Sequence, residues 1–137
     1  MVVFTSVVVE TTNVAVMRIS DAELEVMEAL WSSDDPLTAT DVAERIGADR
    51  DWSLATVKTM LSRLSAKGAI AYREEGRRYL YSAKIARASY VGKESRRFVD
   101  QLFGGRLSPL VARLAEEDAL SEEDIAAIEA ILRELKS

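Results

Sequence analysis

The 137-residue chain contains no cysteine and no histidine. These absences exclude disulfide bonds, zinc sites built from thiolates or imidazoles, and catalysis by a cysteine nucleophile or a serine–histidine–aspartate triad. No run of about 20 apolar residues is present, so we expect no membrane-spanning helix. The apolar start lacks the basic residues of a signal peptide. We therefore expect a cytoplasmic protein with no metal and no other cofactor.

The first sixteen residues carry a single charge, Glu10, and have no helical period. Met17 directly precedes the first strong helix signal. Two interpretations remain open: residues 1–16 are an extension in front of a natural start at Met17, or they form a short arm that becomes ordered on binding. We favour the first.

Charge is distributed unevenly along the chain, whose net charge is −5. Residues 17–52 have a net charge of −7 and residues 108–137 a net charge of −5. Residues 53–84, by contrast, hold seven basic and two acidic side chains, and residues 85–107 add +3. Such a basic segment forms either a solvated face or a surface that contacts a polyanion.

Three helices are predicted before residue 68. Residues 20–23 form a capping box in front of apolar residues at helical spacing, which predicts a helix over about 21–32. A short second helix follows Thr38 and ends at Gly47. Ser53 is expected to cap a third helix that continues to about residue 67.

The third predicted helix has two unlike faces. One is apolar and is expected to be buried; it carries Val57, Met60, Leu61 and Leu64. The opposite face is small and hydroxylated, with basic flanks: Ala55, Thr59, Ser62 and Ala66, with Lys58 and Arg63 beside them. An ordinary surface helix more often mixes Glu with Lys. This face therefore favours a helix that lies in a groove of DNA.

Residues 69–74 and 78–82 alternate with a period of two on either side of Gly76, which predicts a β-hairpin. Three helices followed by a hairpin form a winged helix–turn–helix, which we assign to residues 17–83. The basic segment then coincides with the third helix and the hairpin tip. This coincidence favours nucleic-acid binding over a plain solvated face.

Residues 84–137 are predicted to form three helices: a long one over about 84–103, and two that start near residues 108 and 121. Only 54 residues carry this much branched apolar surface, so a twofold partner is the simplest way to bury it. The fold class is thus mainly α with a small β-hairpin wing. The residues predicted to support dimerisation are Val99, Leu102, Leu110, Leu114, Ile125, Ile128, Ile131, Leu132 and Leu135.

The candidate DNA contacts follow from this arrangement. Residues at the start of the recognition helix can reach base edges or flanking phosphates; they are Ser53, Ala55, Thr56, Lys58 and Thr59. Basic residues farther along the helix and on the wing are expected to contact phosphates; they are Arg63, Lys67, Arg77 and Arg78, with Tyr79 as a further backbone contact.

Several segments together resemble the penicillinase-repressor family (BlaI/MecI type, with the copper-responsive CopY relatives). They are ISDAELEVM at 19–27, DW at 51–52, TVKTMLSRL at 56–64, RYLY at 78–81, FGG at 103–105 and LSEEDI at 120–125. The resemblance implies a bacterial homodimeric repressor, with an N-terminal winged helix on a palindromic operator and a C-terminal helical dimerisation domain.

The resemblance also implies a way to end repression. In that family a membrane-embedded zinc-protease sensor of β-lactams triggers cleavage before a phenylalanine in a Ser-Lys-Asn-Phe run of the long helix. The matching run here is residues 95–98, so the implied bond is Arg97–Phe98, with Arg97 in the place of the asparagine. The copper-responsive branch uses a cysteine pair, which this chain lacks.

We therefore expect a homodimeric repressor that binds double-stranded operator DNA and is released by proteolysis on a β-lactam or cell-envelope signal. The alternative is a winged helix that docks on a protein and shows no salt-dependent DNA binding. An enzyme is not expected, because any catalysis would need paired carboxylates or a lysine, and no glycine-rich phosphate loop is present.

Overall fold

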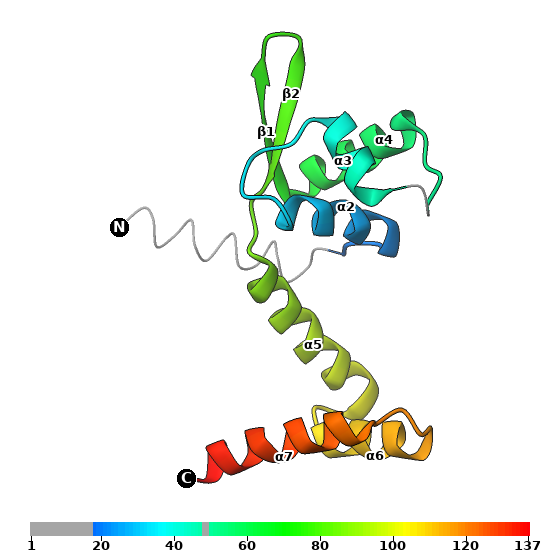
Figure 1. The fold of residues 1–137 in the computed structure, drawn as a ribbon, viewed down its shortest axis with the longest axis vertical. Coiled ribbons are helices and arrows are strands. Elements are labelled where there is room, and N and C mark those ends of the chain that lie inside the picture. Colours follow the sequence, from blue (N-terminus) through cyan, green and yellow to red (C-terminus); the bar gives the residue numbers. More distant parts are fainter. Residues whose placement is uncertain (1–17, 48–49) are drawn as a thin grey trace. The chain divides into compact units, whose positions relative to one another are not determined.

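The computed structural model describes residues 18–47 and 50–137, and it is mainly helical with one two-stranded antiparallel sheet (Figure 1). This confirms the predicted fold class. The elements are α2 (Asp21–Trp31), α3 (Ala39–Ile46), α4 (Leu54–Lys67), β1 (Ile70–Glu75), β2 (Arg78–Ala83), α5 (Arg87–Phe103), α6 (Leu107–Glu116) and α7 (Glu122–Lys136). The chain forms two compact units, of which the first ends at Val91 and the second comprises residues 92–137.

Side-chain caps determine where the helices begin. The Ser20 hydroxyl accepts a hydrogen bond from Glu23 N–H, and the Glu23 carboxylate accepts one from Ser20 N–H, so the predicted capping box is confirmed. Thr38 with Asp41 caps α3 in the same way. Ser53 caps α4 through Thr56 N–H. These bonds satisfy N–H groups that lack a partner within the helix.

The core of the first unit lies where α2, α3 and α4 meet the start of the hairpin. The apolar face predicted for the third helix is confirmed, since Val57, Leu61 and Leu64 are fully buried and Met60 is half-buried. They pack with fully buried Val26, Met27 and Val42. Gly68 then ends α4 in the left-handed conformation, with φ of 82°, which a residue with a Cβ adopts only at a cost.

A buried carboxylate ties α2 to the last residue of α4. Glu23 is 2% exposed, and its Oε1 accepts a hydrogen bond from Lys67 Nζ at 2.5 Å. The same ammonium group donates to the carbonyl oxygen of Arg18. Burial alone would raise the pKa of Glu23, but the hydrogen bonds from Lys67 and Ser20 and the charge of Lys67 outweigh it, so this pKa is lowered.

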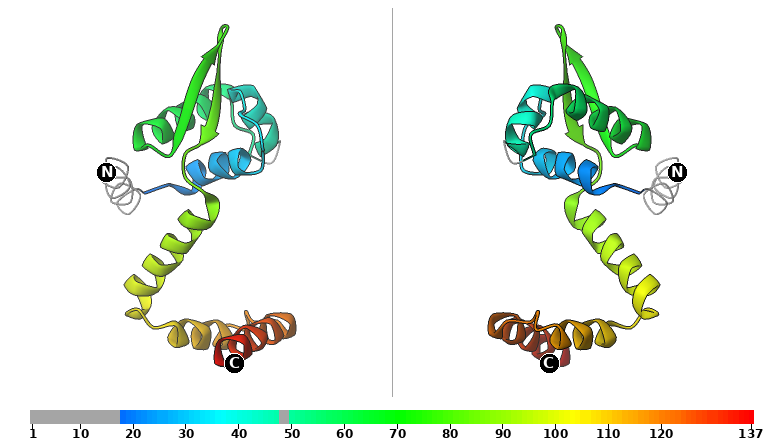
Figure 2. Two further views of the ribbon diagram at one scale, coloured as in Figure 1. Left: turned by 90° about the vertical axis from the view of Figure 1, so that its left-hand side faces the viewer. Right: turned by 90° about the vertical axis from the view of Figure 1, so that its right-hand side faces the viewer.

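The hairpin projects beyond the three helices of the first unit (Figures 1 and 2). Tyr72 is paired with Tyr81 in the register, and Gly76 turns the chain with φ of 66°. Leu37 joins the outer edge of β2: its N–H donates to Tyr81 O at 2.9 Å, and Tyr81 N–H donates to Leu37 O at 2.7 Å. The base of the wing is therefore held by the loop between α2 and α3.

The long helix starts later than predicted, at Arg87 instead of about residue 84. The reason is that Lys84 N–H still donates to Ala69 O, at 2.9 Å, which extends the hairpin. The first compact unit also continues past residue 83, to Val91. Tyr90 is 8% exposed and its ring lies 5.9 Å from that of Trp31, so the first turn of α5 packs on α2.

The second unit has no core of its own. None of residues 92–137 is buried, and Leu102, Ile131 and Leu135 are 65%, 58% and 77% exposed. Within the part of the chain that the structure describes, every helix is too short or too polar to cross a membrane.

Replacing Glu23 by Gln is predicted to lower the free energy of unfolding by about 1.5–3 kcal/mol, the usual contribution of a hydrogen bond to a charged group. Gln keeps the capping bond to Ser20 N–H but leaves the Lys67 ammonium group without a counterion. The control is Glu25→Gln, whose exposed pair with Arg50 should contribute about 0–1 kcal/mol. Equal urea midpoints for the two variants would contradict a stabilising role of the pair.

The Glu23–Lys67 pair should also make the free energy of unfolding depend on pH. The folded-state pKa of Glu23 lies below its ordinary value of 4.5. The contribution of Glu23 to stability is thus complete above about pH 5 and is lost as the pH falls through the lowered pKa. Urea unfolding at pH 7 and at pH 4 should show a smaller acid-induced loss in Glu23→Gln than in the wild type.

Candidate nucleic-acid interface

The outward face of α4 carries small, hydroxylated and basic side chains. Its exposed residues are Ala55, Lys58, Thr59, Ser62, Arg63 and Ala66. Thr56 is half-buried on the flank of this face, and Ser53 is exposed at its start. Within this face no acidic side chain repels a polyanion, and the residues other than Lys58 and Arg63 are small enough to let the helix backbone approach one.

The hydroxyl groups on this face are partly used by the helix itself. Ser53 Oγ accepts from Thr56 N–H at 3.1 Å and lies 3.0 Å from Thr56 Oγ1. Thr59 Oγ1 donates to Ala55 O at 3.0 Å. Each threonine still presents a methyl group and a hydroxyl oxygen with acceptor capacity. Contacts from these residues would therefore combine apolar contact with hydrogen bonding.

Three cations of this surface have no carboxylate close by. Among the described residues, no Asp or Glu oxygen lies within 4.0 Å of the charged groups of Lys58, Arg63 or Arg77. Arg78 differs, because its guanidinium lies 3.1 Å from Glu75 Oε1. That pair is exposed, and exposed pairs hold weakly. Arg78 can therefore exchange Glu75 for another anion.

The two basic elements meet at a pocket. A hollow of about 260 Å³ lies between the start of α3, the start of α4 and the tip-side half of the hairpin. Lys58 lines it from α4, and Arg77 and Arg78 line it from the hairpin; the other lining residues are Thr38, Ala39, Thr40, Leu54, Tyr79 and Tyr81. The Asp41 carboxylate accepts a hydrogen bond from Thr38 N–H at the start of α3 and offsets part of this positive charge. The pocket still suits a phosphate group.

A second hollow, of about 340 Å³, has an aromatic wall on the hairpin. Tyr72, Tyr79 and Tyr81 face Ser62 and Ser65 of α4 across it. The Tyr72 and Tyr79 rings are 5.1 Å apart, edge to face. The negative charge of Glu74, and the hydrogen bond between the two side chains, raise the pKa of Tyr79 above its ordinary value.

Lys67 has a different place from that expected of a phosphate contact. Its ammonium group bonds to the buried Glu23 carboxylate and to Arg18 O, and its side chain is 33% exposed. Moving it to a phosphate would leave Glu23 charged and buried without its partner. We therefore remove Lys67 from the candidate interface and assign it to the packing of α4.

The structure adds residues that sequence reasoning missed. Thr40 and Leu54 line the pocket beside Lys58, and Tyr72 joins the aromatic wall. Two sequence features could have indicated these residues: the capping box that starts at Thr38, and the hairpin register that follows from the turn at Gly76. The first exposes the start of α3, and the second pairs Tyr72 with Tyr81.

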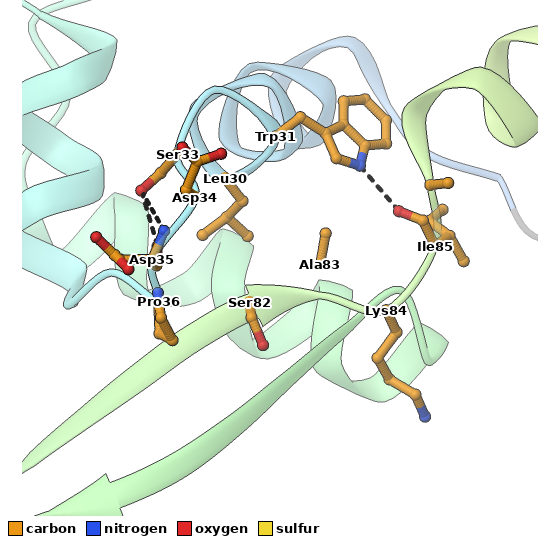
Figure 3. A pocket seen from close by; sticks show the side chains of 11 residues that line it. Leu30, Trp31, Ser33, Asp34, Asp35, Pro36, Ser82, Ala83, Lys84 and Ile85 are labelled. Carbon is orange, nitrogen blue, oxygen red and sulfur yellow. Dashed lines mark hydrogen bonds between the residues drawn. The ribbon is translucent and has the colours of Figure 1, made fainter.

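A larger hollow, of about 480 Å³, lies away from this basic surface, where β2 leads toward α5 (Figure 3). Asp34, Asp35 and Lys84 form its mixed rim, so it does not extend the cationic face. Across the described residues, no three acidic side chains are grouped as ligands of a metal ion.

The residues predicted for dimerisation and cleavage lie in α5, α6 and α7. All nine apolar candidates are exposed or half-buried, with Val99, Leu110 and Ile128 half-buried. The Arg97–Phe98 bond lies within the regular helix α5. Arg97 donates to Glu94 at 2.8 Å and to Gln101 at 3.0 Å, and Phe98 is 47% exposed.

Comparison with known proteins gives matches along nearly the whole described chain. A family profile described as penicillinase repressor matches residues 19–134. The penicillinase repressor of Bacillus licheniformis is 36% identical over 120 residues, which cover 88% of this chain and 93% of that protein. The methicillin resistance regulatory protein MecI of Staphylococcus aureus (strain N315) is 30% identical over 115 residues, covering 84% and 93%.

Solved structures with similarity to this chain include the solution structure of the DNA-binding domain of the repressor BlaI. It is 38% identical, with 53% of this chain and 88% of that chain covered and a TM-score of 0.48. The monomeric form of Bacillus licheniformis BlaI in complex with the blaP half-operator is 37% identical, covering 55% and 90%, with a TM-score of 0.47. Both alignments concern about half of this chain.

Proposed function

The chain belongs to the penicillinase repressor family, whose members are transcriptional repressors and not enzymes. From this membership we propose that it is a homodimer that represses transcription from a palindromic operator. The resemblance carried by the sequence motifs is thus confirmed at the level of the family. DNA-binding repression is the common activity of these relatives. The operator symmetry, the dimer and the release mechanism are our proposals.

The cationic pocket between α3, α4 and the hairpin is the observation that carries the proposal. Lys58, Arg77 and Arg78 converge there from two elements in a protein whose net charge is −5. A cluster of cations in an acidic protein costs energy through mutual repulsion, and a phosphate offsets that cost. We assign this pocket to a phosphate of the operator backbone.

The exposed face of α4 would then enter the major groove. Ala55 and Thr59 offer methyl groups that suit thymine, and Lys58 offers a donor to base acceptors or to the flanking phosphate. Ser53 and Thr56 lie at the start of the helix, where a groove-bound helix contacts base edges. Arg63 and Tyr79 would contact the backbone on either side.

Dimerisation is supported by the second unit. A unit of 46 residues with no buried side chain cannot be stable on the hydrophobic effect of one copy. Apolar side chains form a stripe that repeats over the turns of α7 and is exposed except for half-buried Ile128; they are Ile125, Ile128, Ile131, Leu132 and Leu135. A second copy would bury these stripes and place two recognition helices on one operator.

Release by proteolysis at Arg97–Phe98 is the mechanism we propose for derepression, on a signal from a membrane-embedded metalloprotease sensor of cell-envelope damage. The similarity to a methicillin resistance regulatory protein supports a signal of this class. Because the bond lies within regular helix, α5 must unwind locally before a protease can bind it in an extended form.

Salt dependence tests the DNA contact. With about five phosphates neutralised per protomer, the log of the affinity for operator DNA should fall with log salt at a slope of about −9 for the dimer. Arg77→Ala should reduce the slope to about −7 by removing one contact per protomer. The measurement is a fluorescence anisotropy titration with the fragment upstream of the chain's own gene.

Lys93→Ala, a change of the same charge in the second unit, is the control and should leave the slope unchanged. A scrambled duplex should bind more weakly than the upstream fragment. Equal, weak binding to both duplexes at low salt would contradict operator recognition and favour the protein-docking alternative.

Ile131→Glu is predicted to weaken dimerisation about 100-fold or more, because the dimer would bury this side chain twice. Ala130→Glu adds the same charge on the opposite face of α7 and should leave the dimer intact. Sedimentation equilibrium measures the dissociation constant. Equal dissociation constants for the two variants would contradict an interface built on the α7 stripe.

Cleavage at Arg97–Phe98 is predicted to weaken operator binding because it separates the two DNA-binding units of the dimer. A fragment of residues 1–97 contains the whole core of the first unit, so it should fold and bind a half-site with the affinity of one DNA-binding unit. Its affinity for the full operator should be about 100-fold lower than that of the full chain. A fragment that held the operator as tightly as the full chain would contradict this mechanism.

A further inference from the structure

Gly92 lies inside helix α5, between Val91, the last residue of the first unit, and the rest of the second. Glycine is the weakest helix former after proline, because its backbone loses the most freedom when it becomes helical. In a helix interior, glycine in place of alanine lowers the equilibrium constant for forming the helix locally by about four- to fivefold. The boundary between the units thus coincides with the weakest residue of the helix that connects them.

Packing within the chain does not require a glycine at this position. A Cβ added to Gly92 would meet no atom within 4 Å, and Gly92 is not among the glycines with positive φ. Alanine would fit here without strain and would strengthen the helix. Neither space nor backbone conformation in the single chain therefore accounts for the glycine.

The residues just before Gly92 are firmly attached to the first unit. The indole N–H of Trp31 donates to Ile85 O at 2.9 Å (Figure 3). Arg87 donates twice to the Glu28 carboxylate, at 2.9 and 3.1 Å. These contacts, with the buried ring of Tyr90, anchor the start of α5 on α2. The anchored segment ends two residues before the glycine.

We infer that Gly92 is a joint that sets how much variation in half-site spacing the repressor tolerates. The inference rests on the proposed function, since it needs two DNA-binding units joined through their second units. A firm anchor followed at once by a weak point would confine bending to one place in α5. Each DNA-binding unit can then move as one body about that place.

The expected consequence follows from bivalent binding. One added base pair moves a half-site by about 3.4 Å and turns it by about 34° around the DNA axis. A stiff connection loses effective concentration when both units cannot reach their half-sites together. A joint in α5 widens the range of positions that each DNA-binding unit can reach, and it lowers the affinity at the optimal spacing.

The direct test is the distance between the two units in the full-length protein. Because the chain has no cysteine, the double substitution Glu44→Cys and Glu129→Cys labels one exposed site in α3 and one in α7. Spin labels there give the distribution of distances within one chain when labelled chains are diluted with unlabelled ones. Gly92→Ala should narrow this distribution, whereas Ser89→Ala, a change in the anchored turn of the same helix, should not.

The functional test is binding to a series of operators whose half-site spacing is changed by one or two base pairs. Gly92→Ala should bind the natural spacing at least as tightly as the wild type, and its affinity for the changed spacings should fall about four- to fivefold more than that of the wild type. Ser89→Ala should follow the wild type. Sedimentation equilibrium should give the same dimer dissociation constant for all three proteins.

Equal distance distributions for Gly92→Ala and the wild type would overturn the joint. So would a narrower distribution with an unchanged spacing profile, or a weaker dimer in Gly92→Ala, which would mean that the glycine serves close contact with a second copy. A wild-type protein that binds none of the operators would instead contradict the proposed function. The distance measurement needs no DNA and would still test the joint.

Discussion

The buried pair of Glu23 and Lys67 is the interaction on which the DNA-binding face depends. It joins the first turn of α2, the last residue of α4 and the chain at Arg18 through one ammonium group and one carboxylate. Its partners are 44 residues apart in the sequence, so the bond forms only when the helices are correctly packed. The face of α4 opposite its buried side then carries the exposed residues assigned to DNA. Lys67 cannot hold the Glu23 carboxylate and bind a phosphate at the same time. This is why Lys67, a cation of the basic segment, is absent from the proposed interface.

The two units divide the physical tasks of a repressor. The first has a complete apolar core, capped helices and a braced hairpin, and every residue assigned to DNA belongs to it. The second has apolar side chains that are at most half-buried within one copy, so its stability is coupled to association. Affinity for a two-part operator would then depend on the concentration of the protein as well as on its contacts. This coupling also gives proteolysis in α5 its proposed effect.

Much of this fold could be predicted because the strongest signals are local. The capping boxes at Ser20 and Thr38 and the hairpin turn at Gly76 involve residues within a few positions of each other. The failures were tertiary. The residues near Lys67 in the sequence do not show that its ammonium group binds a buried carboxylate. Likewise, the residues near position 84 do not show that the chain there forms hydrogen bonds with Ala69 and Trp31. The phosphate pocket needed three segments in one place, so only its basic members and Tyr79 could be named beforehand.

The central claim is that two DNA-binding units of an acidic protein engage one operator through the α4 face and the hairpin. Hydroxyl-radical footprinting of the fragment upstream of its gene tests this most directly. The account predicts two protected segments with related sequences, whose centres lie about 10 base pairs, or a small multiple of that distance, apart on one face of the DNA. Protection of a single half-site by the intact protein, or no protection at concentrations where the protein is a dimer, would contradict it.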